Sequence, residues 1–218
     1  MPARPDFPVR EALKRCAAAV ADQPPAAMFG LRDEGYASLY EQLISCILSI
    51  RTYDEVSTVA SRRLFARART PEQMLTLSND DLIDLIHDVT YPGQKAPNIL
   101  QISREIIDHH GGKTPDTFEE LTAFKGVGPK CANLALGVAL DRPVISVDVH
   151  VHRITNRWGY VATKTPEKTM LALREKLPEE LRVEINRVLV PFGKHVCRGR
   201  YPKCRVCPVE RACAKVGV

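Results

Sequence analysis

Apolar residues recur at intervals of three and four along nearly the whole chain, a spacing that places them on one face of a helix. The segments that show it most clearly are 39–48, 82–86, 99–107 and 134–140. Alternation of the strand type is confined to "PVISVDVHVHRI", which begins at Pro143 and is too short and isolated to found a sheet. We therefore predict an all-α protein.

Start and stop signals divide this pattern into short helices. A hydroxyl residue stands before proline or acidic residues, as at a helix N-cap, at four places: Thr70, Ser78, Thr114 and Thr165. Breaks are expected at Tyr91-Pro92-Gly93, Gly111-Gly112, Gly126-Val127-Gly128 and Asp141-Arg142-Pro143. We expect roughly nine or ten helices with tight connections and no long linker.

The composition excludes little on its own. Lys and Arg number 31 against 26 Asp and Glu, a net charge of +5, which is compatible with a polyanionic partner but is common among enzymes. The sequence has no apolar run long enough to span a membrane and no signal-peptide pattern at its start. We expect a cytoplasmic protein, associated with the nucleoid if the source is bacterial, with no membrane partner.

The segment "VCRGRYPKCRVCPVERAC", from Val196 to Cys213, carries four cysteines spaced C-x6-C-x2-C-x5-C. They are Cys197, Cys204, Cys207 and Cys213. In a reducing compartment such thiols are better interpreted as metal ligands than as disulfides. Because only one pair is separated by two residues, the spacing favours an iron-sulfur cluster and leaves structural zinc as the alternative. Cys16, Cys46 and Cys131 lie in apolar helical contexts and are expected to be small buried hydrophobic residues.

Five basic residues lie between these cysteines, and four of them are candidate contacts to DNA: Arg198, Arg200, Lys203 and Arg205. A loop pinned by a metal centre holds its charges at fixed positions, as contacts to phosphates require. The alternative is that the cations only offset the negative charge of a thiolate-bound metal centre. Both roles are compatible with the sequence.

A glycine hairpin is expected at Gly126-Val127-Gly128, with Pro129 opening the helix that follows. Val127 is expected to plug into the apolar interior. The backbone N–H groups at the start of the second helix would then form an anion site suited to a phosphate. We interpret this segment as a helix-hairpin-helix that binds nucleic acid, with a plain helical turn as the alternative.

Lys130 and Asp148 are the candidate reactive residues, and they are eighteen residues apart. A helix N-terminus disfavours the cationic form of a nearby lysine, and the neutral amine is a nucleophile. The effect of the helix end alone is too weak to make the amine neutral, so burial or another cation must contribute. The alternative is a surface lysine that touches phosphate. For Asp148 the alternative is a plain helix N-cap. His150 and His152 are expected to be packing or hydrogen-bonding residues.

Taken in order, the hairpin, the lysine, the aspartate and the cysteine-rich tail resemble the endonuclease III family of DNA glycosylases, the iron-sulfur type of the helix-hairpin-helix superfamily. The resemblance extends from "LISCILSIRTYDEV" at Leu43 to Cys213. It implies two helical domains with a DNA groove between them. A six-helix barrel would span 32–141, with the hairpin motif at about 116–140. A domain holding a [4Fe-4S] cluster would comprise 1–31 and 142–218.

The resemblance also implies a bifunctional DNA glycosylase and abasic-site lyase of base excision repair. Lys130 would attack the sugar of a flipped nucleotide and Asp148 would be the catalytic carboxylate. The expected substrates are oxidised pyrimidines, and the expected partner is double-stranded DNA with damaged bases or abasic sites, bound by a monomer. Gly126, Val127 and Gly128 would contact the DNA backbone.

Both positions expected to act as wedges depart from the family pattern. Arg51 stands where the family often has a glutamine that fills the gap left by the flipped base, and Tyr91 is the candidate for the second wedge. The alternatives are a monofunctional glycosylase for mismatched or damaged bases and a non-catalytic DNA-binding homologue. The presence of Lys130, and an end five residues after Cys213, favour the bifunctional enzyme over the monofunctional adenine glycosylase type.

Overall fold

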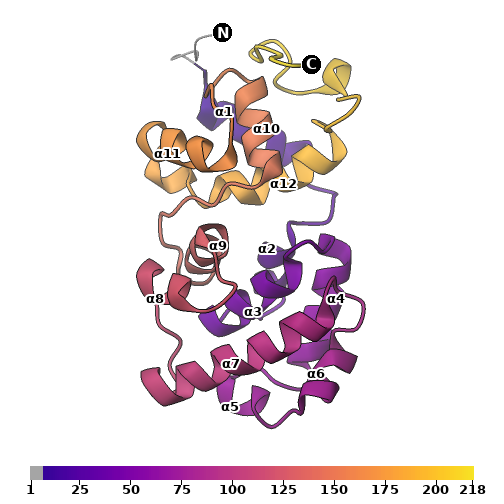
Figure 1. Ribbon diagram of the computed structural model, residues 1–218. Helices are drawn as coiled ribbons and strands as arrows, with labels where there is room; N and C mark the ends of the chain where they lie inside the picture. The colour runs from indigo at the N-terminus through magenta and orange to yellow at the C-terminus, as the bar shows by residue number, and fades with distance from the viewer. Residues whose placement is uncertain (1–6) are drawn as a thin grey trace. The chain divides into compact units, whose positions relative to one another are not determined.

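The computed structural model describes residues 7–218, and in this range it consists of helices and loops without a strand (Figure 1). The prediction of an all-α protein is confirmed. The described chain contains twelve α-helices and two short 3₁₀ helices, more than the nine or ten expected, because the sequence pattern did not resolve segments as short as α5 (Pro71–Met74). None of the described helices combines the length and the apolar character needed to cross a bilayer.

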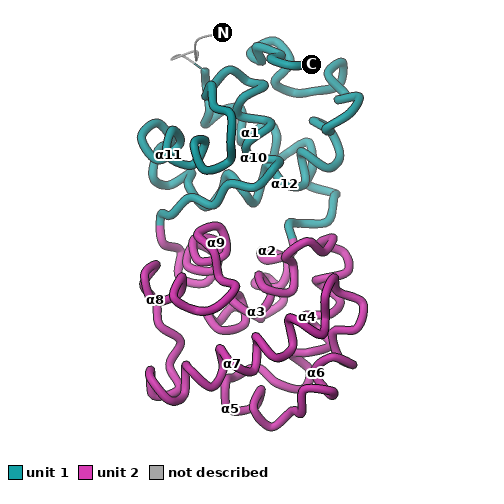
Figure 2. Tube along the Cα trace, viewed as in Figure 1, with its two compact units in different colours: residues 1–26, 143–218 teal, residues 27–142 magenta. Residues whose placement is uncertain are grey.

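The chain divides into two compact units (Figure 2). Unit 1 combines the N-terminal residues up to Ala26 with Pro143–Val218, and unit 2 is Ala27–Arg142. The expected first boundary, between residues 31 and 32, would cut helix α2 (Ala27–Asp33), which packs against helices of unit 2. The boundary therefore precedes α2. The second boundary lies one residue later than expected.

Unit 2 is built around α3 (Leu39–Ser49), in which every residue from Leu39 to Leu48 is buried. It packs against α2, α4, α7 and α9. Its N-terminus is closed by a reciprocal pair of hydrogen bonds between Ser38 and Glu41, which the sequence analysis overlooked. The other helices of the unit are α4 (Asp54–Phe65), α5, α6 (Asn79–Leu85), α7 (Pro92–His110), α8 (Phe118–Ala123) and α9 (Pro129–Leu140).

Three of the four predicted N-caps are confirmed. The hydroxyls of Thr70, Ser78 and Thr165 each accept a hydrogen bond from the backbone N–H three residues later. The prediction for Thr114 is wrong, since Thr117 caps α8 instead. Arg142 binds both the carbonyl oxygen and, at 2.6 Å, the carboxylate of Asp116, which holds the Pro115-Asp116 segment in the loop before the helix.

Unit 1 packs the start of the chain against its last third. α1 (Val9–Ala18) and α10 (Val149–Arg157) both pack on α12 (Glu184–His195), and Trp158 stacks on Phe7 with ring centroids 4.9 Å apart in their shared core. The remaining helices of this unit are α11 (Pro166–Lys176), η1 (Glu179–Leu181) and η2 (Cys204–Val206). The four cysteines of the tail follow α12.

Candidate functional site

The glycine hairpin joins α8 to α9 through residues 124–128. Gly126 has a φ of +78°, and a Cβ at this position would lie 3.1 Å from the side-chain amide nitrogen of Asn98 on α7, so a glycine is required for two reasons. Gly128 has an ordinary extended conformation, with a φ of −91°, and is the N-cap of α9. Of the two hairpin glycines, only Gly126 therefore uses a backbone conformation that other residues resist. Val127 is buried, as predicted.

Lys130 is the second residue of α9 and is exposed. The burial that would favour a neutral amine is therefore not provided at this position. Directly after it, Cys131 is buried and shares a hydrogen bond with the buried thiol of Cys46 on α3. This bond, together with burial, raises the pKa of Cys131 well above its usual value. Cys16, Cys46 and Cys131 are all buried, as expected for core residues.

Asp148 is the N-cap of α10. Its Oδ1 accepts hydrogen bonds from the backbone N–H groups of His150 at 2.9 Å and Val151 at 2.8 Å. Both of these bonds go to Oδ1, so Oδ2 takes no part in capping the helix. The structure thus gives Asp148 the capping role considered from the sequence, and that role occupies half of its carboxylate. Asp148 belongs to unit 1 and Lys130 to unit 2.

Arg51 and Tyr91, the two candidate wedges, line one cavity in unit 2 together with Lys125 and Gly126 of the hairpin. Both have left-handed backbone conformations, with φ of +56° and +60°, which side chains other than glycine rarely adopt. Arg51 is exposed, and Tyr91 retains 51% of its accessible surface although it is a large aromatic residue. The structure therefore brings these two residues and the hairpin to the same surface.

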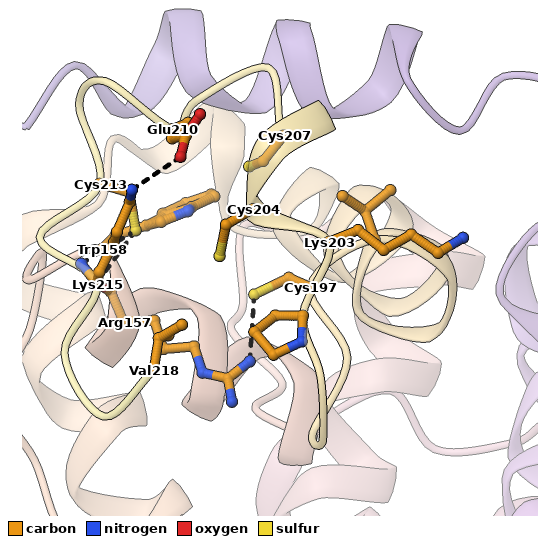
Figure 3. A pocket seen from close by; sticks show the side chains of 12 residues that line it. Arg157, Trp158, Cys197, Lys203, Cys204, Cys207, Glu210, Cys213, Lys215 and Val218 are labelled. Atoms are coloured by element: carbon orange, nitrogen blue, oxygen red, sulfur yellow. Dashed lines mark hydrogen bonds and ion pairs between the residues drawn. The ribbon is translucent and has the colours of Figure 1, made fainter.

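The four cysteines of the tail line a single cavity in unit 1, and their sulfur atoms face a common space (Figure 3). Burial, together with nearby thiolate charge on Cys197, Cys213 and Cys204, raises the pKa of Cys207 to about 11. Burial also raises the pKa of Cys213, so the thiols of Cys207 and Cys213 resist ionisation unless a cation is bound beside them. Four thiols around one cavity are a donor set that fits a metal centre. Within residues 7–218, however, no three His, Cys, Asp or Glu side chains are arranged to hold a single metal ion.

The charged groups around this cavity divide into two sets. Arg157 of α10 donates to Cys197 Sγ at 3.5 Å and to the carbonyl oxygens of Arg198 at 2.5 Å and Gly199 at 2.9 Å. The side chains of Arg198, Arg200, Lys203 and Arg205 are exposed, and the amine of Lys203 points away from the sulfurs (Figure 3). The guanidinium that donates to a thiol therefore comes from α10, and in the tail Lys215 donates its backbone N–H to Cys213 Sγ at 3.3 Å.

Comparison with known proteins identifies the family. Residues 44–179, more than half of the chain, match the family described as HhH-GPD superfamily base excision DNA repair protein. The sequence is 44% identical over 174 residues to Endonuclease III of Thermotoga maritima, covering 80% of this chain and 82% of the relative. It is 32% identical over 178 residues to Endonuclease III of Escherichia coli (strain K12), covering 82% of this chain and 84% of the relative. The chain belongs to the endonuclease III family.

Solved structures agree with this assignment. A non-covalent endonuclease III–DNA complex has a TM-score of 0.80 and 26% identity, and a trapped endonuclease III–DNA covalent intermediate has a TM-score of 0.79 and 26% identity. Each comparison covers 95% of this chain and 94% of the other. A thermostable thymine-DNA glycosylase, at 19% identity and a TM-score of 0.75, shares the fold. As a member of the endonuclease III family, this chain is a DNA-binding glycosylase of base excision repair.

The endonuclease III fold also positions residues that the sequence analysis did not select. Besides Arg157, Arg153 of α10 binds the carbonyl oxygens of Gly193 at 3.0 Å and Cys197 at 2.9 Å, so two arginines of one helix hold the start of the cysteine loop. The signal for them was a pair of arginines four residues apart in a helix with an apolar face. His152 binds Thr169 at 2.6 Å, which confirms its hydrogen-bonding role. Lys95, a buried residue that lines the same cavity as Arg51 and Tyr91, was also missed.

Proposed function

We propose that this protein is a bifunctional DNA glycosylase and abasic-site lyase that removes oxidised pyrimidines, with Lys130 as its nucleophile. The observation that carries the proposal is the position of Lys130. It is exposed in the first turn of α9, directly after a hairpin whose Gly128 leaves open space where a side chain would stand. A covalent intermediate with DNA has been trapped for a similar endonuclease III, which supports a nucleophile of the enzyme's own.

The proposed reaction begins when the damaged nucleotide leaves the stack, which costs less for a base that stacks poorly. The Lys130 amine attacks C1′ of the sugar, and the bond from C1′ to the base breaks as the base departs with the bonding electrons. Loss of the amine proton and opening of the sugar ring give a Schiff base. Removal of a C2′ proton then expels the 3′ phosphate by β-elimination, which cuts the strand.

Asp148 is proposed to accept the proton of the Lys130 amine or to stabilise the positive charge that develops on the sugar. Its cap supports this role, because two backbone N–H groups fix the orientation of the carboxylate through one oxygen only. A helix N-terminus also favours a negatively charged side chain. The same contacts that make Asp148 a cap therefore give it a fixed orientation and leave Oδ2 for the reaction.

Arg51 and Tyr91 are proposed to fill the gap in the duplex when the damaged nucleotide leaves. Their exposure and their shared cavity support this role. The guanidinium of Arg51 offers several donors to the unpaired partner base, and a bidentate contact to guanine is the pairing that its geometry favours. Gly126 and Gly128 would meet a DNA phosphate at the first turn of α9.

The tail is proposed to hold a [4Fe-4S] cluster through Cys197, Cys204, Cys207 and Cys213. The four thiols line one cavity, and their spacing, with a single pair separated by two residues, suits an iron-sulfur cluster better than structural zinc. When bound, the cluster would fix the loop, so that Arg198, Arg200, Lys203 and Arg205 present their charges to phosphates. Visible absorption together with iron and acid-labile sulfide content tests the cluster, and stoichiometric zinc without iron would contradict it.

Borohydride trapping on duplex DNA with an abasic site tests the nucleophile. Reduction of a Schiff base leaves a covalent protein–DNA adduct, which we expect with the unaltered protein and not with Lys130→Gln. Lys125→Gln is the matched control, since Lys125 is another exposed lysine of the same hairpin segment, and it should still form the adduct. On a duplex that carries an oxidised pyrimidine, base release without an adduct would indicate a monofunctional glycosylase, and binding without base release would indicate a non-catalytic homologue.

A further inference from the structure

Lys95 is a buried lysine in the first turns of α7, with only 8% of its surface accessible. Its ammonium donates to the carbonyl oxygens of Leu48 at 2.7 Å and Ile50 at 2.8 Å, and to the hydroxyl of Thr52 at 3.1 Å. Three donors therefore meet three acceptors, all from the end of α3 and the turn that follows. Burial lowers the pKa of this amine to about 8, yet its hydrogen bonds are directed to structural partners and not toward a substrate.

The backbone of Lys95 also contacts the second turn, the one that contains Tyr91. The backbone N–H of Lys95 donates to the carbonyl oxygen of Tyr91 at 3.1 Å. Thr90 adds two direct links between the turns: its hydroxyl donates to the carbonyl oxygen of Arg51 at 2.8 Å, and its backbone N–H donates to the hydroxyl of Thr52 at 3.1 Å. The segments 50–52 and 90–91 are thus held to each other, and Lys95 lies at the centre of the links.

These links are needed because both wedge residues have unfavourable backbone conformations. Arg51 and Tyr91 each have positive φ, and non-glycine residues keep such angles only where their surroundings impose them. Neither residue has a side chain packed in the core, since both are exposed. The hydrogen bonds that Lys95 and Thr90 make to the adjoining residues therefore help to hold these two turns.

We propose that Lys95 is a positioning residue that fixes Arg51 and Tyr91 as one rigid wedge for opening the duplex. The inference rests on the proposed function, since it assigns the role of the wedge to these turns. Unpairing and unstacking a base cost free energy, and the wedge offsets that cost by filling the gap. A rigid wedge therefore matters only while a paired base must be displaced. Once the base is already unpaired, the arrangement of the two turns has little left to contribute.

The test compares two duplexes under single-turnover conditions. In one, an oxidised pyrimidine lies opposite guanine, and in the other the same lesion lies opposite an abasic analogue, so that no pair must be broken. For Lys95→Met we expect base release from the paired duplex to fall about tenfold or more relative to release from the unpaired one. Thr90→Val, which removes only the hydroxyl link to Arg51, should shift the same ratio by less. If Lys95→Met does not fold, Thr90→Val alone serves as the test.

Ile106→Val is the control, because Ile106 is a fully buried residue of the same helix away from the two turns. It should lower stability without changing the ratio between the two duplexes. An equal loss on both duplexes for Lys95→Met and Thr90→Val would overturn the proposal. Borohydride trapping on single-stranded abasic DNA separates the two levels of the argument, since failure of the unaltered protein to form an adduct there would refute the proposed function itself.

Discussion

Gly126 and Gly128 stand two residues apart in the hairpin but serve different purposes. Gly126 has a φ of +78° and no room beside Asn98, whereas Gly128 has an ordinary φ and no atom within 4 Å of the position that a Cβ would take. The first glycine is therefore required by the fold. The second leaves the entrance to the first turn of α9 open for a ligand.

We expect Gly126→Ala to reduce the free energy of unfolding by about 1–2 kcal/mol, because alanine pays the cost of the left-handed conformation and approaches Asn98. Gly128→Ala should cost less, about 0.5–1 kcal/mol, because the backbone is ordinary and the loss is only that of a glycine N-cap replaced by alanine. It should nevertheless weaken DNA binding, since the added methyl lies where a phosphate would approach. Denaturant unfolding and DNA titration of both variants check this, and the reverse pattern would contradict it.

Asp148 allows its capping and catalytic roles to be separated by two substitutions. Asparagine still accepts the two backbone hydrogen bonds, so Asp148→Asn should leave stability nearly unchanged while abolishing base release. Asp148→Ala should lose activity and also about 0.5–2 kcal/mol of stability. Thermal unfolding and glycosylase assays are the measurements. Full activity of the asparagine variant would show that Asp148 is only a helix cap.

At the scale of elements, α10 joins two parts of unit 1 that lie far apart in the sequence. It begins at its cap, Asp148, and ends at Arg157, which binds Cys197 Sγ and two carbonyl oxygens of the cysteine loop. Arg153, one turn earlier, holds the same loop. The proposed catalytic carboxylate and the anchors of the proposed cluster thus belong to one rigid helix.

We expect Arg157→Leu to lower both metal content and stability. Arg157 retains only 7% of its surface, and its removal takes the charged donor from the carbonyl oxygens of Arg198 and Gly199, at a cost of about 1.5–3 kcal/mol for each hydrogen bond to a charged group. Visible absorption per protein and denaturant unfolding measure the two effects. Arg174→Leu, an exposed arginine of α11 in the same unit, is the control and should change neither.

Local signals predicted the elements well where they depend on a few neighbouring residues. The caps at Thr70, Ser78 and Thr165 follow from side-chain chemistry within one turn. The break expected at Tyr91-Pro92-Gly93 ends at Tyr91, because α7 begins at Pro92. The cap at Thr117 was missed because Arg142, distant in sequence, holds Asp116 in the loop. Lys95 and Arg157 were missed for the same reason, because each binds acceptors more than forty residues away in the sequence.

At the scale of the whole molecule, motif order identified the family, although the individual motifs are weak. Hairpin, lysine, aspartate and cysteine tail belong to two units, and unit 1 is assembled from both parts of the chain that flank unit 2. Such an arrangement is invisible to composition or periodicity. The position of the first boundary was missed because the apolar residues of α2, such as Phe29 and Leu31, do not indicate from the sequence which unit's core they pack in.

The net charge of +5 is small, so the distribution of exposed cations decides how strongly salt weakens DNA binding. Each cation that neutralises a phosphate steepens the fall of log K with log salt by about 0.9. Changing Arg198, Arg200, Lys203 and Arg205 together to glutamine should therefore flatten the slope by roughly 3 to 4. Lys14→Gln, an exposed cation of α1, is the control. If visible absorption is retained and the slope is unchanged, these cations only balance the charge of the metal centre, because phosphate contacts cannot be lost without a change in counterion release.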